Sequence, residues 1–345
     1  MRRDRGGAAA AAAVRAGDAA TADLDAPIAA LHLPGLRANI ADLRRRAGGT
    51  RIRIASKSVR ARGVLKEVLG PDLRGDEAVR GIMAYSLDEA LWLVGSGADD
   101  VLMGYPTVDR GALARLGADP VALEAVTLMV DDPRQLDLAG EAGASGARVC
   151  IDVDASLRMG PVHLGVRRSP LRSPEDVAPL VRRAQRMGFR VVGAMFYEAQ
   201  VAGVPDDVLG IGLVKRLSMR GLRGLRVAVA DMIGEITGTW PEIVNSGGSG
   251  SVAESAAAPA VTEVTAGSGL YVPGLFDGYR SLTTFLYGGY VASGVPGPDR
   301  LPVPASPTGL RYLGREGAGE VQTPVRGEVP VGGRSWWRHA KAGEL

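Results

Sequence analysis

The sequence has little cysteine and no long apolar run. Cys150 is the only cysteine among 345 residues, which excludes an internal disulfide and a zinc site built from several thiolates. A single thiol also fits a protein of the reducing cytoplasm, which is the location we expect. No stretch of about 18 strongly apolar residues occurs, so we expect no transmembrane helix and no membrane partner.

The chain also lacks a strong excess of charge of either sign. It carries 41 lysine and arginine residues against 38 acidic ones, a net charge of +3. No segment interleaves basic clusters with aromatic residues, as a nucleic-acid surface would. We therefore expect no nucleic-acid partner.

Composition changes along the chain indicate four segments. Residues 1–23 are rich in alanine without a leucine-rich core, which predicts a disordered leader and not a targeting signal. Residues 24–34 contain the apolar stretch Ile28–Leu33, which predicts a short strand. Residues 35–293 alternate strand and helix patterns. Residues 294–345 begin rich in proline and glycine and continue as short β segments, which predicts a second, β-rich domain that is incomplete at the C-terminus.

Strands that alternate with helices predict parallel pairing through right-handed crossovers. Eight such units fit a (β/α)8 TIM barrel of the α/β class, and a doubly wound open sheet is the alternative. The even number of strands favours the barrel. The predicted strands are Ile52–Ser58, Gly81–Ser86, Asp100–Pro106, Ala125–Val130, Ala147–Asp154, Phe189–Glu198, Ile243–Gly248 and Val261–Gly267.

Lys57 follows the first predicted strand. Active sites of such barrels lie at the C-terminal ends of the strands, so this lysine is expected in the barrel mouth, where partial desolvation favours an amine nucleophile. The alternative is a lysine that extends to solvent.

Two turns rich in glycine and serine follow the seventh and eighth strands, where barrels often bind phosphate. Ser251 and Glu254 predict a capping box and a helix whose N-terminus favours an anion, although a flexible loop is the alternative. Two adjacent phosphate cradles opposite a lysine suit a phosphorylated aldehyde held as a Schiff base, and pyridoxal phosphate is the commonest such cofactor. The two turns are Val244–Ser251 and Glu263–Tyr271.

Two further side chains are expected in the mouth. Arg158, after the fifth strand, could contact the cofactor ring or a substrate carboxylate, or else cap a neighbouring carbonyl. Tyr197, after the sixth strand, is either a cofactor contact or a buried structural tyrosine.

The sequence resembles the fold-type III pyridoxal-phosphate enzymes, the alanine racemase-like barrels. Within them the likeness is strongest to the D-threonine aldolase and D-serine dehydratase branch, especially to proteins called amino acid deaminase/aldolase. It extends from about Asp25 to the last residue and rests on ASKSVR, YSLDEALWL, DDVLMGYP, DASLRMG, HLGVRRSP, FYEAQVAG, VNSGGSGS, TAGSGLYVPGLFDGY and GREGAGEVQTP.

The resemblance implies a Schiff base on Lys57 and a cofactor-ring contact from Arg158. It also implies a phosphate cup formed by Ser246, Gly247, Gly248, Ser249, Gly250, Ser251, Gly267 and Ser268. It implies a homodimer in which the β-rich domain completes the partner's site, and a lyase acting on a β-hydroxy D-amino acid. An amino acid racemase and a catalytically silent cofactor-binding protein are the alternatives.

The branch also implies a divalent metal, for which His339 resembles the first ligand. Ala340 and Lys341 follow it, so the second ligand is not at the expected spacing. The alternatives are that Glu344 or a residue past the end of this sequence is the second ligand, or that no metal is bound. Gln200 stands where the aldolases often have histidine.

Overall fold

A closed barrel of eight parallel strands forms the centre of the protein. The computed structural model describes residues 7–25, 28–160, 162–166, 168–203, 210–274, 276, 302–313, 323–330 and 333–340. The strands run around the barrel in the order β1-β10-β9-β8-β5-β4-β3-β2, so the last strand pairs with the first. All eight predicted strands and the TIM barrel are confirmed. The strands are β1 (Arg51–Ala55), β2 (Val79–Ala84), β3 (Val101–Pro106), β4 (Val126–Val130), β5 (Arg148–Asp152), β8 (Arg190–Phe196), β9 (Ile243–Ser246) and β10 (Glu263–Ala266).

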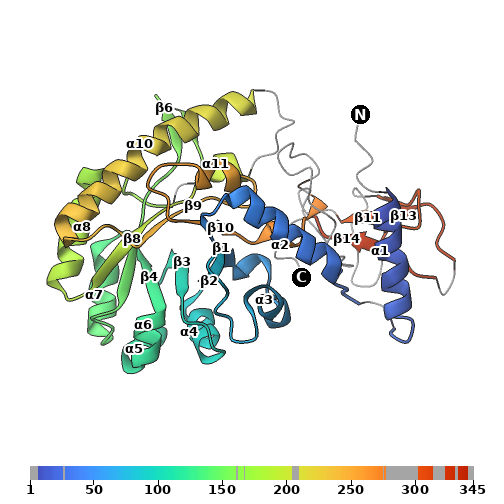
Figure 1. Ribbon diagram of the computed structural model, residues 1–345, viewed down its shortest axis with the longest axis horizontal. Coiled ribbons are helices and arrows are strands. Elements are labelled where there is room, and N and C mark those ends of the chain that lie inside the picture. The colour runs from blue at the N-terminus through green and yellow to red at the C-terminus, as the bar shows by residue number, and fades with distance from the viewer. Residues whose placement is uncertain are drawn as a thin grey trace.

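Helices cover the outside of the barrel (Figure 1). Their starts follow from the sequence: Ser86 accepts a hydrogen bond from the amide of Glu89, and Asp132 and Ser173 cap helices that begin with proline. The main helices are α2 (Leu33–Ala47), α3 (Arg62–Leu69), α4 (Leu87–Gly95), α5 (Arg110–Ala118), α6 (Pro120–Ala125), α7 (Pro133–Glu141), α8 (Pro174–Arg186), α10 (Ile211–Thr237) and α11 (Val252–Ala256).

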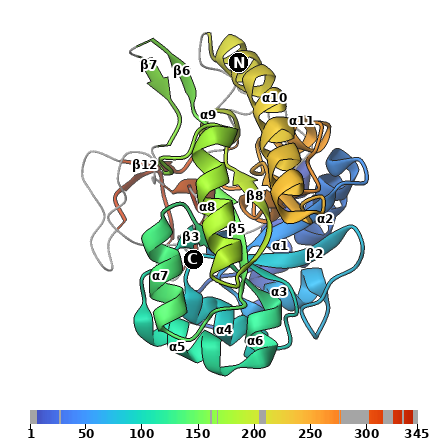
Figure 2. The same ribbon diagram turned by 90° about the vertical axis from the view of Figure 1, so that its left-hand side faces the viewer.

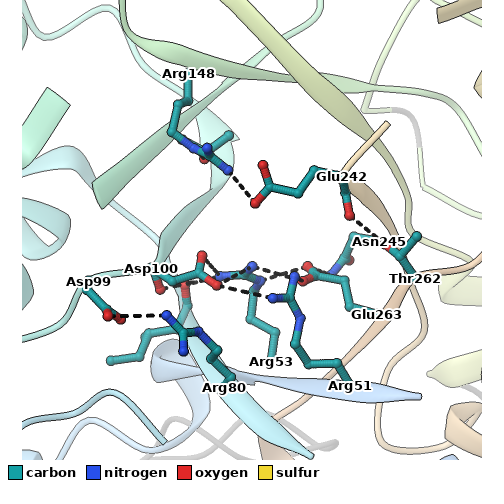
Figure 3. A network of polar contacts seen from close by, with 12 residues as sticks. Arg51, Arg53, Arg80, Asp99, Asp100, Arg148, Glu242, Asn245, Thr262 and Glu263 are labelled. Atoms are coloured by element: carbon teal, nitrogen blue, oxygen red, sulfur yellow. Dashed lines mark hydrogen bonds and ion pairs between the residues drawn. The ribbon is translucent and has the colours of Figure 1, made fainter. Parts of the chain in front are cut away.

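The barrel interior combines an apolar core with one buried ion cluster. Apolar strand residues such as Ile52, Val149 and Val264 are fully buried. Arg53, also fully buried, donates to Glu263 at 2.7 and 2.8 Å and to Asp100 at 2.7 and 3.1 Å (Figure 3). Glu263 begins β10 and Asp100 precedes β3, so this cluster fills the N-terminal end of the barrel and leaves the C-terminal end for a site.

An antiparallel hairpin interrupts the connection from β5 to α8. It consists of β6 (Leu157–Met159) and β7 (Val162–Leu164), which turn at Gly160. Figure 2 shows the hairpin extending beyond the barrel beside α10. Residues of the fifth strand's C-terminal loop are therefore carried away from the barrel axis before the chain returns.

The two ends of the chain meet in a small β-rich unit beside the barrel (Figure 1). Its strands are β11 (Val303–Ser306), β12 (Arg311–Tyr312), β13 (Val325–Arg326) and β14 (Trp336–Arg338), paired as β11-β14 and β12-β13. The helix α1 (Gly7–Ala20) contacts β11. Extra β structure at the C-terminus is thus confirmed, while residues 294–301 of the predicted linker lie outside the described residues.

Two predictions for the N-terminal segment are wrong. The predicted disordered leader is helical over Gly7–Ala20, because alanine has the highest helix propensity and Val14 packs against Trp336. Ile28–Leu33 is not a strand: Ala30 makes an isolated bridge, and α2 begins at Leu33. Ile28 and Ala30 nevertheless pack beside Trp336.

Candidate active site

A cavity of about 510 Å³ opens at the C-terminal ends of the barrel strands. Its walls come from the ends of β1, β3, β8, β9 and β10 and from the segments that follow them. These are the positions where (β/α)8 barrels carry catalytic groups. Its polar lining includes Lys57, Tyr105, Arg168, Tyr197, Asn245, Ser249, Thr265 and Ser268.

Lys57 presents its amine to this cavity. It lies in a short 3-10 turn, Ser56–Ser58, immediately after β1. Its Nζ donates to the Tyr105 hydroxyl at 2.8 Å and lies 5.2 Å and 5.9 Å from the ring centres of Tyr105 and Tyr197. The amine is therefore held inside the mouth by a residue of β3, and the alternative of a lysine extended into solvent is not what the structure shows.

The pKa of the Tyr105 hydroxyl is lower than that of an ordinary tyrosine. Burial acts to raise its pKa, but the hydrogen bond from Lys57 and the positive charges of Lys57 and Arg168 outweigh it, so the pKa is lowered. For Tyr197, burial and the nearby Glu198 raise the pKa. Of the two tyrosines, Tyr105 is thus the better placed to exchange a proton with the lysine amine.

Arg168 is a cationic side chain of the cavity wall, together with Lys57 and Arg60, and the sequence pattern did not predict it. Its Nε lies 3.1 Å from a carboxylate oxygen of Asp152, and its Nη2 donates to the carbonyl of Gly104 at 2.5 Å. Its guanidinium lies 4.7 Å from the ring centre of Tyr105 and 5.8 Å from that of Tyr197. These contacts fix a positive charge beside two aromatic faces.

Arg158, the predicted arginine, lies elsewhere. It is on β6, its side chain is 38% exposed, and it pairs with Asp154 at 3.1 Å. It does not line the cavity, because the hairpin carries it away from the mouth. The sequence did contain a signal for this, because the dipeptide Gly160-Pro161 is typical of a turn and Arg168 follows it.

Donors from two turns converge on one point of the cavity wall. The Ser249 hydroxyl accepts hydrogen bonds from the amides of Gly269 at 2.8 Å and Gly267 at 3.4 Å, and the Ser268 hydroxyl lies 3.2 Å away. The Ser249 hydroxyl therefore lies where two backbone amides and one hydroxyl direct their hydrogen atoms. A side chain at Gly267 would put its Cβ 2.7 Å from the carbonyl of Ala55, so the close approach requires glycine.

The remaining predicted phosphate ligands lie in three different places. Gly247 and Gly248 line the cavity, whereas Gly250 lines a separate hollow between α10 and α11. Ser246 and Ser251 lie behind the loop, are fully buried and bind Glu198. Ser251 precedes α11 but does not cap it through its side chain, so the predicted capping box is wrong.

The described residues do not supply a metal site around His339. They contain no group of three or more histidine, cysteine or acidic side chains that could hold an ion. His339 is buried with its ring 6.1 Å from that of Tyr271, edge to face. Gln200 donates to the carbonyl of Ala155, and Glu344 lies outside the described residues.

Comparison with known proteins identifies the fold. No family model and no curated protein matches the sequence, whereas many solved structures match the structure. D-threonine aldolase from Filomicrobium marinum is 20% identical with a TM-score of 0.74, over 93% of this chain and 88% of that one. D-threo-3-hydroxyaspartate dehydratase from Delftia sp. HT23 is 16% identical with a TM-score of 0.59, over 93% and 86%. Alanine racemase from Oenococcus oeni is 16% identical with a TM-score of 0.56, over 92% and 90%.

These matches extend over both the barrel and the β segments beside it. Among the described residues, no helix is long and apolar enough to cross a bilayer. The resemblance noted in the sequence is therefore confirmed at the level of architecture: this chain has the fold of the fold-type III pyridoxal-phosphate enzymes.

Proposed function

We propose that this protein is a pyridoxal-phosphate-dependent lyase that acts on β-hydroxy D-amino acids. The observation that carries the proposal is the placement of the Lys57 amine in the same cavity as the donors that converge on Ser249. A primary amine and an anion cradle facing one cavity suit an aldehyde that carries a phosphate.

The residues present fit the cofactor. Lys57 would hold its aldehyde carbon, and the hydroxyls of Ser249 and Ser268 with the amides of Gly267 and Gly269 would hold its phosphate. Tyr197 lines the same cavity and would contact the cofactor. Bound in this way, pyridoxal phosphate supplies an electron sink for cleavage of a bond at the α- or β-carbon of an amino acid.

The remaining polar side chains orient the reactants and move protons. Arg168 carries a fixed positive charge for the cofactor ring hydroxyl or the substrate carboxylate. Tyr105 accepts a hydrogen bond from Lys57 Nζ, so it can take a proton from that amine or return one to it. Asp152 holds Arg168 in place.

The preference for a lyase over a racemase is supported by the likeness to the aldolase branch in sequence and by the TM-score of 0.74 against the D-threonine aldolase. The racemase alternative is supported by alanine racemase, which matches over 92% of this chain. The β segments from Val303 onward speak against a silent barrel-only protein.

A substrate panel separates these reactions. Purified protein with pyridoxal phosphate should convert D-threonine or D-serine to an aldehyde or to a keto acid and ammonia, with both alanine enantiomers offered in parallel. Sensitivity to a chelator would support a divalent metal, which stays a prediction. Rapid interconversion of D- and L-alanine, with no aldehyde or ammonia from the hydroxy amino acids, would favour the racemase.

We also propose a cytoplasmic homodimer. The β-rich unit beside the barrel, formed by both ends of the chain, is the surface that we expect to meet the partner. Sedimentation equilibrium should give twice the chain mass, and a monomer over the whole concentration range would contradict this part of the proposal.

A further inference from the structure

Glu198 lies behind the glycine loop, between β8 and α9 (Ala199–Ala202), and is fully buried. One carboxylate oxygen accepts from the Ser246 hydroxyl at 2.9 Å and from the Gly247 amide at 3.1 Å. The other accepts from the Ser251 hydroxyl at 2.9 Å and from the Ser255 hydroxyl. A single carboxylate therefore binds four donors from one segment of ten residues.

Arg226 of α10 is the counter-charge and is also fully buried. Its Nη2 donates to the Ser246 hydroxyl at 2.5 Å and lies 3.5 Å from Glu198. Its Nε and Nη1 have no hydrogen-bond partner among the described residues. Burying two opposite charges with incomplete hydrogen bonding seldom adds stability over apolar side chains, so stability alone does not account for the pair.

The four donors stand on both sides of the loop tip. Ser246 and Gly247 precede Gly248–Gly250, and Ser251 and Ser255 follow them. Fixing both sides to one carboxylate leaves the tip directed toward the cavity, where Ser249 meets the amides of Gly267 and Gly269. Gly247 has a φ of 90°, which the tight turn above the carboxylate requires.

We infer that Glu198 is the positioning residue of the phosphate cradle, with Arg226 as its counter-ion. The carboxylate occupies the inner donors, so that only the outer ones, around Ser249 and Ser268, face a ligand. Arg226 offsets the negative charge that would otherwise repel a phosphate dianion. This inference rests on the proposed cofactor. The donors that bind Glu198 hold the shape of the loop, and the donors around Ser249 and Ser268 bind the phosphate.

Comparing two ligands tests the inference. Glu198→Gln keeps the size of the side chain but replaces one acceptor oxygen with a donor, so the loop should lose its shape. Affinity for pyridoxal phosphate should fall by about tenfold or more, as expected for a lost charge-assisted bond, while affinity for pyridoxal changes little. Amide hydrogen exchange over residues 246–251 should become faster.

Glu263→Gln is the matched control, because Glu263 is an equally buried carboxylate paired with an arginine at the other end of the barrel. It should lower stability while leaving the ratio of the two affinities unchanged. Equal losses for both ligands in Glu198→Gln, with exchange unchanged over 246–251, would overturn the inference. A wild type without preference for pyridoxal phosphate over pyridoxal would instead refute the proposed cofactor site.

Two further variants give a result even where Glu198→Gln does not fold. Ser255→Ala removes one of the four donors without touching the cavity, and it should also lower the affinity for pyridoxal phosphate selectively. Arg226→Met keeps the four donors on Glu198 but leaves the carboxylate uncompensated, so the added negative charge behind the cradle should weaken binding of pyridoxal phosphate more than binding of pyridoxal. Absence of a selective loss in both Ser255→Ala and Arg226→Met would contradict the positioning role.

Discussion

Asp152 is a buried carboxylate that faces the guanidinium of Arg168 and the carboxylates of Asp131 and Asp154. Burial is the largest influence and raises its pKa to about 6, although the ion pair with Arg168 acts in the opposite direction. The raised value means that the folded protein binds this proton more tightly than the unfolded chain does. Ionisation of Asp152 therefore lowers the stability of the folded state as the pH rises.

Asp152→Asn tests this protonation equilibrium. Asp152 is neutral in both states below pH about 3, and its ionisation destabilises the folded state progressively up to pH about 7. The free energy of unfolding of the wild type, relative to Asp152→Asn, should fall by about 3 kcal/mol between those pH values. Denaturant unfolding at both pH values measures this change, with Asp137→Asn, at a partly exposed carboxylate, as the control. A difference that does not change with pH would contradict the raised pKa.

Arg168 and Arg158 form a natural pair for testing which arginine serves the site. Arg168→Met removes the charge beside Tyr105, so affinity for pyridoxal phosphate or for a carboxylate substrate should fall by about tenfold or more. Arg158→Met removes a partly exposed ion pair outside the cavity and should have a much smaller effect. Titration of both variants with pyridoxal phosphate under identical conditions measures the two losses of affinity. A larger loss of affinity in Arg158→Met would show that Arg158, and not Arg168, serves the site.

The position of a single side chain in the cavity could be predicted where that residue follows the end of a barrel strand closely. Lys57, Tyr197, Ser249 and Ser268 follow their strands at once and line the cavity as expected. Arg168 was missed because a hairpin separates it from β5. Glu198 lies within the motif FYEAQVAG, but its role could not be predicted, because that role depends on donors 48 to 57 residues away in the chain.

Helices and strands could be predicted from the sequence where local apolar patterns and helix caps mark them. The barrel strands are short apolar runs, and the caps at Ser86, Asp132 and Ser173 mark helix starts that the structure confirms. The helix α1 was not predicted, because its alanine-rich composition resembles low-complexity sequence. What holds it is a distant contact: the Trp336 indole donates to Asp18 at 2.6 Å across 318 residues.

Gly17→Val tests the docking of α1. A Cβ at Gly17 would lie 3.3 Å from the Trp336 ring, so a branched side chain there should push the helix away. Hydrogen exchange should accelerate in α1 and β14. Ala16→Val is the control, because Ala16 is exposed one position earlier in the same helix. Equal exchange in both variants would show that α1 is not held by this contact.

The barrel carries different groups at its two ends. The N-terminal end holds the ion cluster of Arg53, Glu263 and Asp100, in which the pKa of both carboxyls is lowered by the arginine despite burial (Figure 3). The C-terminal end holds the cavity. In (β/α)8 barrels the N-terminal end of the strands typically serves stability, whereas the C-terminal end carries the active site.

Arg53→Met should therefore affect stability without altering ligand preference. Removing the arginine leaves Glu263 buried without its main counter-charge, which should lower the free energy of unfolding by about 3–5 kcal/mol. Arg80→Met removes the exposed pair with Asp99 and should lower it by less than about 1 kcal/mol. Denaturant unfolding of the two variants gives both numbers, and similar losses would show that the cluster is not a major support of the barrel.

The central claim is that Lys57 binds pyridoxal phosphate covalently, and one measurement tests it most directly. Protein incubated with pyridoxal phosphate is reduced with borohydride, digested and analysed by mass spectrometry. The chain's other lysines, Lys66, Lys215 and Lys341, serve as internal controls. The account predicts a phosphopyridoxyl group on Lys57 and its loss in Lys57→Ala. A stoichiometric adduct on another lysine, or none on Lys57, would contradict it.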